Sequence, residues 1–166
     1  MMCNVKYPVV MAGTGDRHED LRGIELALRR ISSIGRSRDA GRLRAEVAGV
    51  HLTNQAAGIL SALTTEGPLR SSALAEAVDT DAPIVSRELK SLRAQGYVDV
   101  VVDPTDGRAR VVSLTDVGRD VYRRFRDATD AITAGAFDDW NDGDLLTLRA
   151  LLDRVVADFA SARRPD

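Results

Sequence analysis

Apolar positions recur every three or four residues over most of the chain, and this spacing predicts a series of amphipathic helices. The first predicted helix begins at Arg17, and its apolar face comprises Leu21, Ile24, Leu28 and Ile31. The pattern becomes irregular after Ile31 and resumes at Leu43 and Val47. We therefore expect this helical region to bend or break near Gly35 or Gly41.

Two shorter helices are expected next. Thr53 suits a helix N-cap, and the apolar face that follows it comprises Ala56, Ile59, Leu60 and Leu63. The sequence Glu66-Gly67-Pro68 predicts the end of this helix. Ser71 or Ser72 is expected to cap a third helix, and Asp79-Thr80-Asp81 to form the turn after it.

The helix that follows this turn has an apolar back and a basic front. Its apolar positions, Val85, Leu89 and Leu92, fall on one face and should be buried. The opposite face carries small, polar or basic residues, namely Pro83, Arg87, Lys90, Ser91 and Ala94. Asp81 or Thr80 can cap the first turn, and Gly96 can end the helix in a left-handed conformation. Such a helix can pack on its own domain and enter a groove about 12 Å wide.

A β-hairpin is predicted directly after this helix. Residues 97–102 form a β-branched run, and a shorter run begins at Val111 and leads to Leu114. Between them lies Asp106-Gly107, a strong hairpin signal. Arg108 and Arg110 flank the tip and point to the same side if both are in strand conformation. Two guanidinium groups there suit phosphate or narrow minor-groove binding.

The C-terminal third is predicted to form two long helices. Thr115 can cap the first, and Asn141 followed by Asp144 suits the start of the second. The last helix has a broad apolar stripe that comprises Leu145, Leu148, Leu151, Leu152, Val155, Val156 and Phe159. This stripe is wider than a small core needs, which indicates a partner surface.

Charge is distributed unevenly, although the net charge of the chain is only −2. Residues 17–44 contain eight arginines against four acids, and residues 82–110 contain five bases against four acids. Residues 115–166 contain eight arginines against eleven aspartates. The acidic bias therefore lies in the part of the chain expected to face away from nucleic acid.

The residues that enzymes and metal sites need are scarce. The chain has two histidines, one cysteine (Cys3), no glycine-rich phosphate loop and no nucleophile elbow. We expect no enzyme activity, no metal and no cofactor. There is no apolar run of about 18 residues, so no membrane span is expected, and the single cysteine fits a reducing cytoplasm.

Four blocks of the sequence follow one another in a characteristic order. They are Val85-Ser86-Arg87 with Leu89 and Leu92, then Gly96-Tyr97-Val98, then Asp103-Pro104-x-Asp106-x-Arg108, and then Ser113-Leu114-Thr115-x-x-Gly118. In these blocks, the sequence resembles the MarR family of bacterial winged helix-turn-helix transcription regulators. The resemblance implies a mainly α fold with a small β-hairpin wing, in which N- and C-terminal helices form a dimer. One departure follows Tyr97, where the family commonly has basic residues and this chain has Asp99 and a valine run.

The predicted organisation has four parts. Residues 1–16 are expected to form a mobile arm, and residues 17–50 a helical region that contributes to dimerisation. Residues 51–115 are expected to form the winged helix-turn-helix lobe, and residues 116–162 the C-terminal dimerisation helices. Cys3 lies in the expected arm, where it is more plausible as an incidental cysteine than as a redox sensor.

The candidate DNA contacts come from the basic helix and the hairpin. On the helix they are Arg87 and Lys90, with Ser86, Pro83 and Ile84 at the edges of the same face. On the hairpin they are Arg108, Arg110 and Asp106. Arg108 is expected in the minor groove, and Asp106 can hold its side chain extended through an ion pair. The plainer alternatives are a solvated helix face and an ion pair that only shapes the loop.

These features predict a DNA-binding transcriptional regulator. The resemblance implies a ligand-responsive repressor that binds a pseudo-palindromic operator in double-stranded DNA as a homodimer. It also implies a small-molecule effector pocket between the DNA-binding lobe and the dimer helices, which His51 could line, although a surface histidine is the simpler interpretation. Two alternatives remain: a winged-helix protein-interaction module, and a small-molecule-binding dimer that does not bind DNA.

Overall fold

The computed structural model describes residues 16–162 of the chain. The predicted N-terminal arm and Cys3 therefore lie outside the described residues, apart from Asp16, which caps the first helix. The helices are α1 (Arg17–Arg36), α2 (Arg38–Ala48), α3 (Asn54–Glu66), α4 (Ser71–Ala77), α5 (Ala82–Ala94), α6 (Asp116–Ala136) and α7 (Asp142–Ala162). The strands are β1 (Leu69–Arg70), β2 (Val98–Val102) and β3 (Arg110–Leu114).

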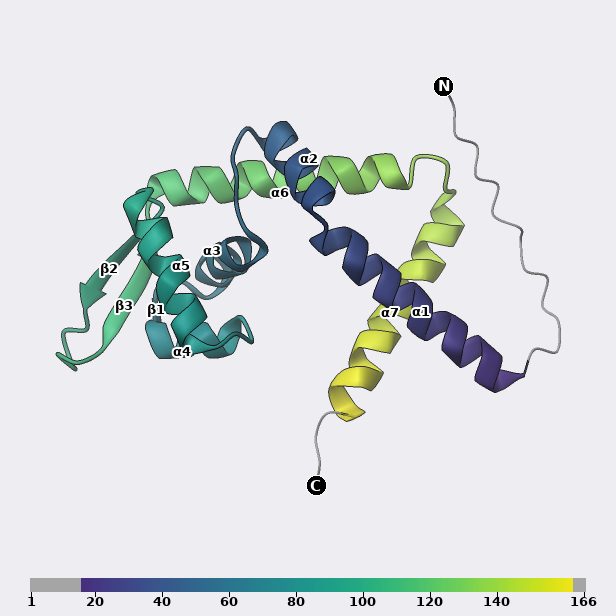
Figure 1. The fold of residues 1–166 in the computed structure, drawn as a ribbon, viewed down its shortest axis with the longest axis horizontal. Coiled ribbons are helices and arrows are strands. Elements are labelled where there is room, and N and C mark those ends of the chain that lie inside the picture. Colours follow the sequence, from purple (N-terminus) through teal and green to yellow (C-terminus); the bar gives the residue numbers. More distant parts are fainter. Residues whose placement is uncertain (1–15, 163–166) are drawn as a thin grey trace.

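The arrangement of these elements confirms the predicted mainly helical fold with a small β-hairpin wing. The helices α3, α4 and α5 and the sheet form a lobe at one side of the molecule, and α1 and α7 lie at the other (Figure 1). The long helix α6 runs from the sheet to the connection with α7 (Figure 1). The three strands are antiparallel in the order β1-β3-β2, so β3 is central.

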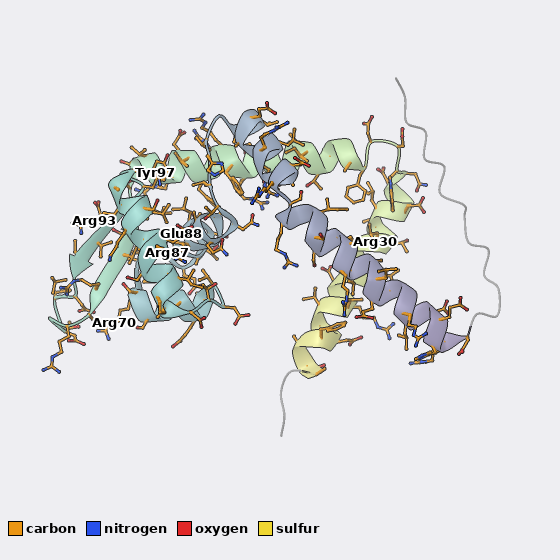
Figure 2. All side chains as sticks on the ribbon, in the orientation of Figure 1. Arg30, Arg70, Arg87, Glu88, Arg93 and Tyr97 are labelled. Atoms are coloured by element: carbon orange, nitrogen blue, oxygen red, sulfur yellow. The ribbon has the colours of Figure 1, made fainter. Side chains whose placement is uncertain are left out.

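The first helical region breaks close to one of the two predicted places. Ser37 is extended between α1 and α2, and its side chain accepts a hydrogen bond from the Ala40 amide at 3.1 Å. Gly41 lies inside α2, so the break falls next to Gly35 instead. No residue of α1 is buried, and its side chains extend into open space around most of the helix (Figure 2).

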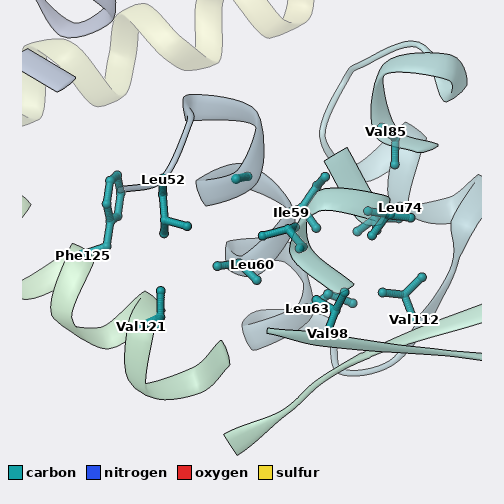
Figure 3. Close-up of a cluster of buried hydrophobic side chains, with 13 residues drawn as sticks. Leu52, Ile59, Leu60, Leu63, Leu74, Val85, Val98, Val112, Val121 and Phe125 are labelled. Carbon is teal, nitrogen blue, oxygen red and sulfur yellow. The ribbon is translucent and has the colours of Figure 1, made fainter. Parts of the chain in front are cut away.

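The hydrophobic core lies within the lobe and extends to the first half of α6. Ile59 and Leu60 from α3, Leu74 from α4 and Leu92 from α5 are completely inaccessible to solvent (Figure 3). The sheet contributes its inner face, and α6 contributes Val121 and Phe125. Because several elements meet around α3, the position of the recognition-like helix α5 is fixed by side-chain packing on its apolar back.

The start of α4 differs from the prediction. Neither Ser71 nor Ser72 is the N-cap, because Ser71 is already helical and Arg70 occupies the cap position without a side-chain capping bond. The reason is the additional strand β1, in which Leu69 and Arg70 pair with Val112 and Val111 of β3. This pairing holds the chain extended up to the first residue of α4.

The helices α6 and α7 begin with the predicted caps. The side chain of Thr115 accepts from the Gly118 amide at 2.9 Å, and Asn141 Oδ1 accepts from the Asp144 amide at 2.9 Å. Between the helices, the rings of Phe137 and Trp140 meet edge to face at 5.2 Å. None of the helices that the structure describes in residues 16–162 is long and apolar enough to cross a membrane.

Candidate nucleic-acid interface

The helix α5 presents its polar face outward, as the sequence predicts. Val85, Leu89 and Leu92 are buried against the core. Asp81 occupies the N-cap position but makes no side-chain capping bond, whereas Gly96 has the predicted left-handed backbone at φ 73°. The predicted contacts Pro83, Ser86, Arg87 and Lys90 are exposed, and Ile84 is half-buried.

One acidic residue of α5 is bonded to the start of α3. The carboxylate of Glu88 accepts a hydrogen bond from the Thr53 hydroxyl, which also caps α3. Figure 2 labels Glu88 beside Arg87 on α5. This bond directs the negative charge of Glu88 toward α3, so the exposed face of α5 carries mainly basic side chains.

The wing is longer than the two-residue turn that Asp106-Gly107 suggests. The last paired residues are Val102 and Arg110, so residues 103–109 form the loop. Inside it, Asp106 Oδ1 accepts from the backbone amide of Arg108 at 3.0 Å. The expected ion pair between Asp106 and the Arg108 guanidinium is not among the ion pairs of residues 16–162, and Asp106 shapes the loop through this backbone hydrogen bond instead. Arg108 is not in a strand, so the condition for both arginines to share one side of the ribbon is not met.

A groove of about 400 Å³ separates α5 from the wing. The apolar part of its lining includes Val85, Leu89 and Val100. The lining also includes the cationic residues Lys90, Arg93 and Arg110 and the hydroxyl-bearing residues Ser71, Ser72 and Ser86. The fold thus brings basic residues from the helix and the hairpin to one concave surface, including Arg93, which sequence reasoning missed because it lies beyond the last predicted contact on the helix.

The cations of this surface take part in none of the ion pairs of residues 16–162, and the same holds for several arginines elsewhere, including Arg30, Arg42 and Arg124. Within residues 16–162, ion pairs join arginines of α1, α6 and α7 to acids one turn away on the same helix. A further ion pair joins Arg70 to Asp103. In this described part of the chain, none of the pairs involves Arg87, Lys90, Arg93, Arg108 or Arg110. Exposed cations without an acidic neighbour keep their attraction for phosphate groups.

The root of the wing contains a buried carboxylate that the sequence analysis did not identify as a site. Asp103 is only 7 % exposed and accepts hydrogen bonds from the amide and hydroxyl of Thr105 and from the Arg70 guanidinium. The hydrogen bonds from Thr105, together with Arg70, lower the pKa of Asp103 from 3.8 to about 2. The sequence Asp-Pro-Thr could have indicated the turn, but its partner Arg70 is in the unpredicted strand β1.

The predicted effector residue His51 borders a separate cavity. This cavity has a volume of about 380 Å³ and lies between α2 and the start of α3. Its lining includes Arg38, Arg42, Arg44, His51 and Asn54. Arg44 Nη2 donates to the carbonyl of Gly35 at 3.0 Å and to Asn54 Oδ1 at 3.3 Å, and its guanidinium lies 5.9 Å from the centre of the Phe125 ring. Arg44 thus links α1, α2, α3 and α6.

The junction after the wing explains the block Leu114-Thr115-x-x-Gly118. The Thr115 hydroxyl donates to the carbonyl of Gly96 at 2.7 Å, and the Thr115 amide donates to the carbonyl of Tyr97 at 3.1 Å. A Cβ at Gly118 would lie 2.0 Å from the Tyr97 carbonyl oxygen, so this position accepts only glycine without movement. The block therefore attaches the start of α6 to the end of α5.

A helix-turn-helix with a basic outer helix and an adjoining basic hairpin defines a winged-helix DNA-binding protein. Residues 51–109 match the family model described as MarR family. The chain is also 33% identical over 101 residues to the uncharacterized HTH-type transcriptional regulator Mb0904 of Mycobacterium bovis, with 59% of this chain and 71% of that protein aligned. The chain therefore belongs to the MarR family: it is a DNA-binding transcriptional regulator and not an enzyme.

Two solved structures illustrate the similarity of fold. The PcaV transcriptional regulator of Streptomyces coelicolor is 26% identical, with a TM-score of 0.64 over 84% of this chain and 98% of that chain. A mutant MarR of E. coli in complex with operator DNA is 17% identical, with a TM-score of 0.64 over 85% of this chain and 99% of that chain. The family assignment favours the DNA-binding regulator over the two alternatives considered from the sequence.

Proposed function

We propose that this protein is a ligand-responsive repressor that binds a pseudo-palindromic operator as a homodimer. The observation that carries the proposal is the groove between α5 and the wing, which brings together Lys90, Arg93 and Arg110, none of them in an ion pair within residues 16–162. A dimer would place two copies of α5 in successive major grooves, about 34 Å apart. Repression would follow because the bound dimer blocks access of the polymerase.

On the recognition helix, Arg87 and Lys90 are the proposed base or phosphate contacts. Both are exposed, and the short side chains of Ser86 and Pro83 allow close approach of the helix to the groove. Ile84 is half-buried at the edge of this face, where it can contact a thymine methyl group. Arg93 adds a cation to the groove between α5 and the wing, where a phosphate of the backbone can bind.

On the wing, Arg108 is the proposed minor-groove contact and Arg110 a phosphate contact. Arg108 belongs to the loop beyond the last pair of the hairpin, and Arg110 lines the groove beside α5. Arg110 Nη1 donates to the carbonyls of Gly107 and Ala109, at 3.3 and 3.1 Å. Asp106 contributes by shaping the turn that presents Arg108.

The dimer is proposed from the apolar surface of α1 and α7. No residue of either helix is buried in the single chain. The exposed apolar side chains on these two helices include Ile31, Ile34, Leu146, Leu151, Val156 and Phe159. Surfaces of this kind are typical of interfaces between subunits.

The ligand response is proposed from the cavity next to His51. It adjoins Arg44, which bonds both the end of α1 and the start of α3. A solved structure of PcaV holds its natural ligand, which supports a ligand-binding role in a related chain. A ligand that favours one arrangement of α1 relative to α3 would change the separation of the two recognition helices and hence the affinity for DNA.

The experiment that tests the interface is fluorescence anisotropy with DNA from the gene's own upstream region, in a salt series, for the wild-type protein and Arg108→Ala. We expect affinity to fall steeply with salt and Arg108→Ala to reduce both the affinity and the salt slope. Arg126→Ala is the matched control, because Arg126 pairs with Asp130 on α6, outside the proposed interface. Equal binding by Arg108→Ala would refute the wing assignment. Absence of binding to this DNA and to a random-sequence library would refute the interface.

A further inference from the structure

The buried carboxylate at the root of the wing is unusual among the charged groups of the molecule. Among residues 16–162, Asp103 is the one charged residue that is buried. A buried carboxylate is strongly unfavourable unless hydrogen bonds and a counter-charge compensate the lost hydration. The hydrogen-bond partners of Asp103 therefore indicate which parts of the structure this residue connects.

Three side chains close a ring around this carboxylate. Asp103 Oδ1 accepts from the Thr105 amide at 2.7 Å and from the Thr105 hydroxyl at 2.6 Å. Asp103 Oδ2 accepts a hydrogen bond from Arg70 Nε at 2.7 Å and forms an ion pair with Arg70 Nη2, also at 2.7 Å. Arg70 Nη2 also donates to Thr105 Oγ1 at 3.3 Å, which closes the ring. We refer to Arg70, Asp103 and Thr105 as the wing clamp.

The wing clamp joins the loop to the helix-turn-helix. Arg70 pairs with Val111 in the sheet and is also the N-cap residue of α4, the first helix of the helix-turn-helix (Figure 2). Thr105 lies inside the loop, two residues beyond Asp103. The clamp therefore fixes the wing to the same framework that carries α5.

The clamp also sets the path of the chain toward the wing tip. The Asp103 amide donates to the carbonyl of Ala109 at 3.1 Å, and the Asp106 amide donates to the carbonyl of Asp103 at 3.3 Å. Asp106 in turn accepts from the Arg108 amide. An unbroken series of bonds thus runs from the clamp to the residue proposed to enter the minor groove.

We propose that Arg70 and Asp103 are positioning residues for DNA binding, which hold the wing tip in its binding geometry without contacting DNA themselves. The inference rests on the proposed function, because it requires that the wing binds DNA. The guanidinium of Arg70 is neutralised by Asp103, so it is a poor phosphate ligand. A loop that is ordered before binding loses less conformational entropy when its arginines engage the DNA.

For the substitution Asp103→Asn, the wing clamp and simple electrostatics predict changes in DNA affinity of opposite sign. Removing a negative charge near DNA should strengthen binding, because the phosphates repel carboxylates. In the clamp, the charge of Asp103 is needed to hold Arg70 and Thr105, so its removal should weaken binding. Asp103→Asn keeps the shape of the side chain and isolates this effect.

The experiment measures the dissociation constant of the full chain for its DNA by anisotropy, for Asp103→Asn and for the control Asp99→Asn. Asp99 is an exposed acid on β2, and no ion pair involves it in residues 16–162. We expect Asp103→Asn to bind roughly tenfold more weakly and Asp99→Asn to bind equally or more tightly. Equal or tighter binding by Asp103→Asn would overturn the proposal.

Arg70 provides a second arm that separates positioning from direct contact. Arg70→Gln should weaken binding, and Arg70→Lys should recover part of the loss because it keeps the charge next to Asp103. In an Arg108→Ala/Arg110→Ala background, Arg70→Gln should have little further effect, because the side chains that it positions are gone. A full, additive loss in that background would mean that Arg70 contacts DNA, and the proposal would be wrong.

Hydrogen exchange of the Thr105 amide tests the clamp without DNA. This amide should lose part of its protection in Asp103→Asn, because a neutral amide oxygen is a weaker acceptor than a carboxylate, and keep it in Asp99→Asn, while circular dichroism confirms that both variants are folded. Unchanged protection would overturn the clamp. If Arg108→Ala/Arg110→Ala binds DNA with wild-type affinity, the proposed role of the wing in DNA binding is wrong. If that double variant binds more weakly but Asp103→Asn binds with wild-type affinity, only the wing clamp is wrong.

Discussion

At the scale of single residues, Gly118 and Asp103 each hold one part of the candidate interface in place. Gly118 lets the first turn of α6 lie against the carbonyl of Tyr97, where a Cβ would be only 2.0 Å away. Asp103 holds the root of the wing through Thr105 and Arg70. Neither residue faces the proposed DNA directly, so their substitution should act through structure.

Gly118→Ala should lower the free energy of unfolding by about 1–3 kcal/mol, because the added methyl group forces backbone to move. The control is Gly135→Ala on the same helix, where no atom lies within 4 Å of the new Cβ. There alanine should stabilise the protein by roughly 0.5–1 kcal/mol through its higher helix propensity. Urea denaturation of both variants measures the difference, and a Gly118→Ala protein as stable as the wild type would contradict the close contact.

The pH dependence of stability should reveal Asp103. Its pKa is lowered to about 2 in the folded protein, so the folded state favours the ionised carboxylate. The contribution to stability is therefore complete above the ordinary pKa of 3.8 and is lost as the pH falls toward 2. Denaturation of the wild type and Asp103→Asn between pH 2 and pH 6 should give a difference that shrinks on acidification. A difference that stays constant with pH would argue against an ionised, bonded Asp103.

At the scale of elements, the features that could be predicted from the sequence are those determined by residues close together in the chain. The caps at Thr53, Thr115 and Asn141 and the left-handed Gly96 depend on residues within a few positions, and all four are observed. The strand β1 could not be predicted, because two residues acquire strand structure only by pairing with β3, more than 40 positions away. The prediction that Ser71 or Ser72 caps α4 is wrong for the same reason, because it did not include β1.

The candidate site shows the same contrast. Features set by neighbouring residues could be predicted from the sequence, and features set by contacts between distant residues could not. Outward-facing Arg87 and Lys90 follow from helical periodicity alone, and the structure places both on the exposed face of α5. The wing loop and the wing clamp required knowledge of contacts between positions 33 apart, such as Arg70 with Asp103. Sequence periodicity carries no information about such pairs, so it could not indicate a structural role for Asp103.

For the recognition helix, we expect Arg87→Ala and Lys90→Ala to distinguish base contacts from phosphate contacts. A base contact should cost about 1–3 kcal/mol and relax the preference at one operator position. A phosphate contact should weaken binding to all sequences and reduce the salt slope by about 1. Anisotropy with a set of single-base operator variants separates the two results. If neither variant changes affinity or slope, α5 does not form the interface.

At the scale of the whole molecule, the helices differ in where their apolar residues lie. Those of α3, α4 and α5 are largely buried in the core of the lobe, whereas α1 and α7 carry most of the exposed large apolar side chains. Val156 of α7 is 69 % exposed and Ile34 of α1 is 68 % exposed, although both belong to amphipathic helices. A second copy of the chain would cover these faces.

We expect Leu152→Asp with Phe159→Asp to shift the protein from dimer to monomer in sedimentation velocity experiments, because buried charges disfavour an apolar interface. The control is Arg149→Ala, which alters an exposed ion pair with Asp153 on the same helix. DNA affinity should fall with the loss of the dimer, because one half-site replaces two. A dimer that persists in the double variant would show that α7 lies outside the interface.

Because α6 is one continuous helix, a tilt at one of its ends produces a displacement of the other end. Its 21 residues span about 31 Å without interruption, from the contact of Gly118 with Tyr97 at the end of α5 to the loop before α7. A tilt of about 5° at the α7 end would displace the other end by about 3 Å over this length. That displacement is close to the rise of about 3.4 Å between successive base pairs. Because Val121 and Phe125 anchor the first half of α6 in the core of the lobe, such a tilt would carry α5 with it and shift α5 by about one base pair along DNA.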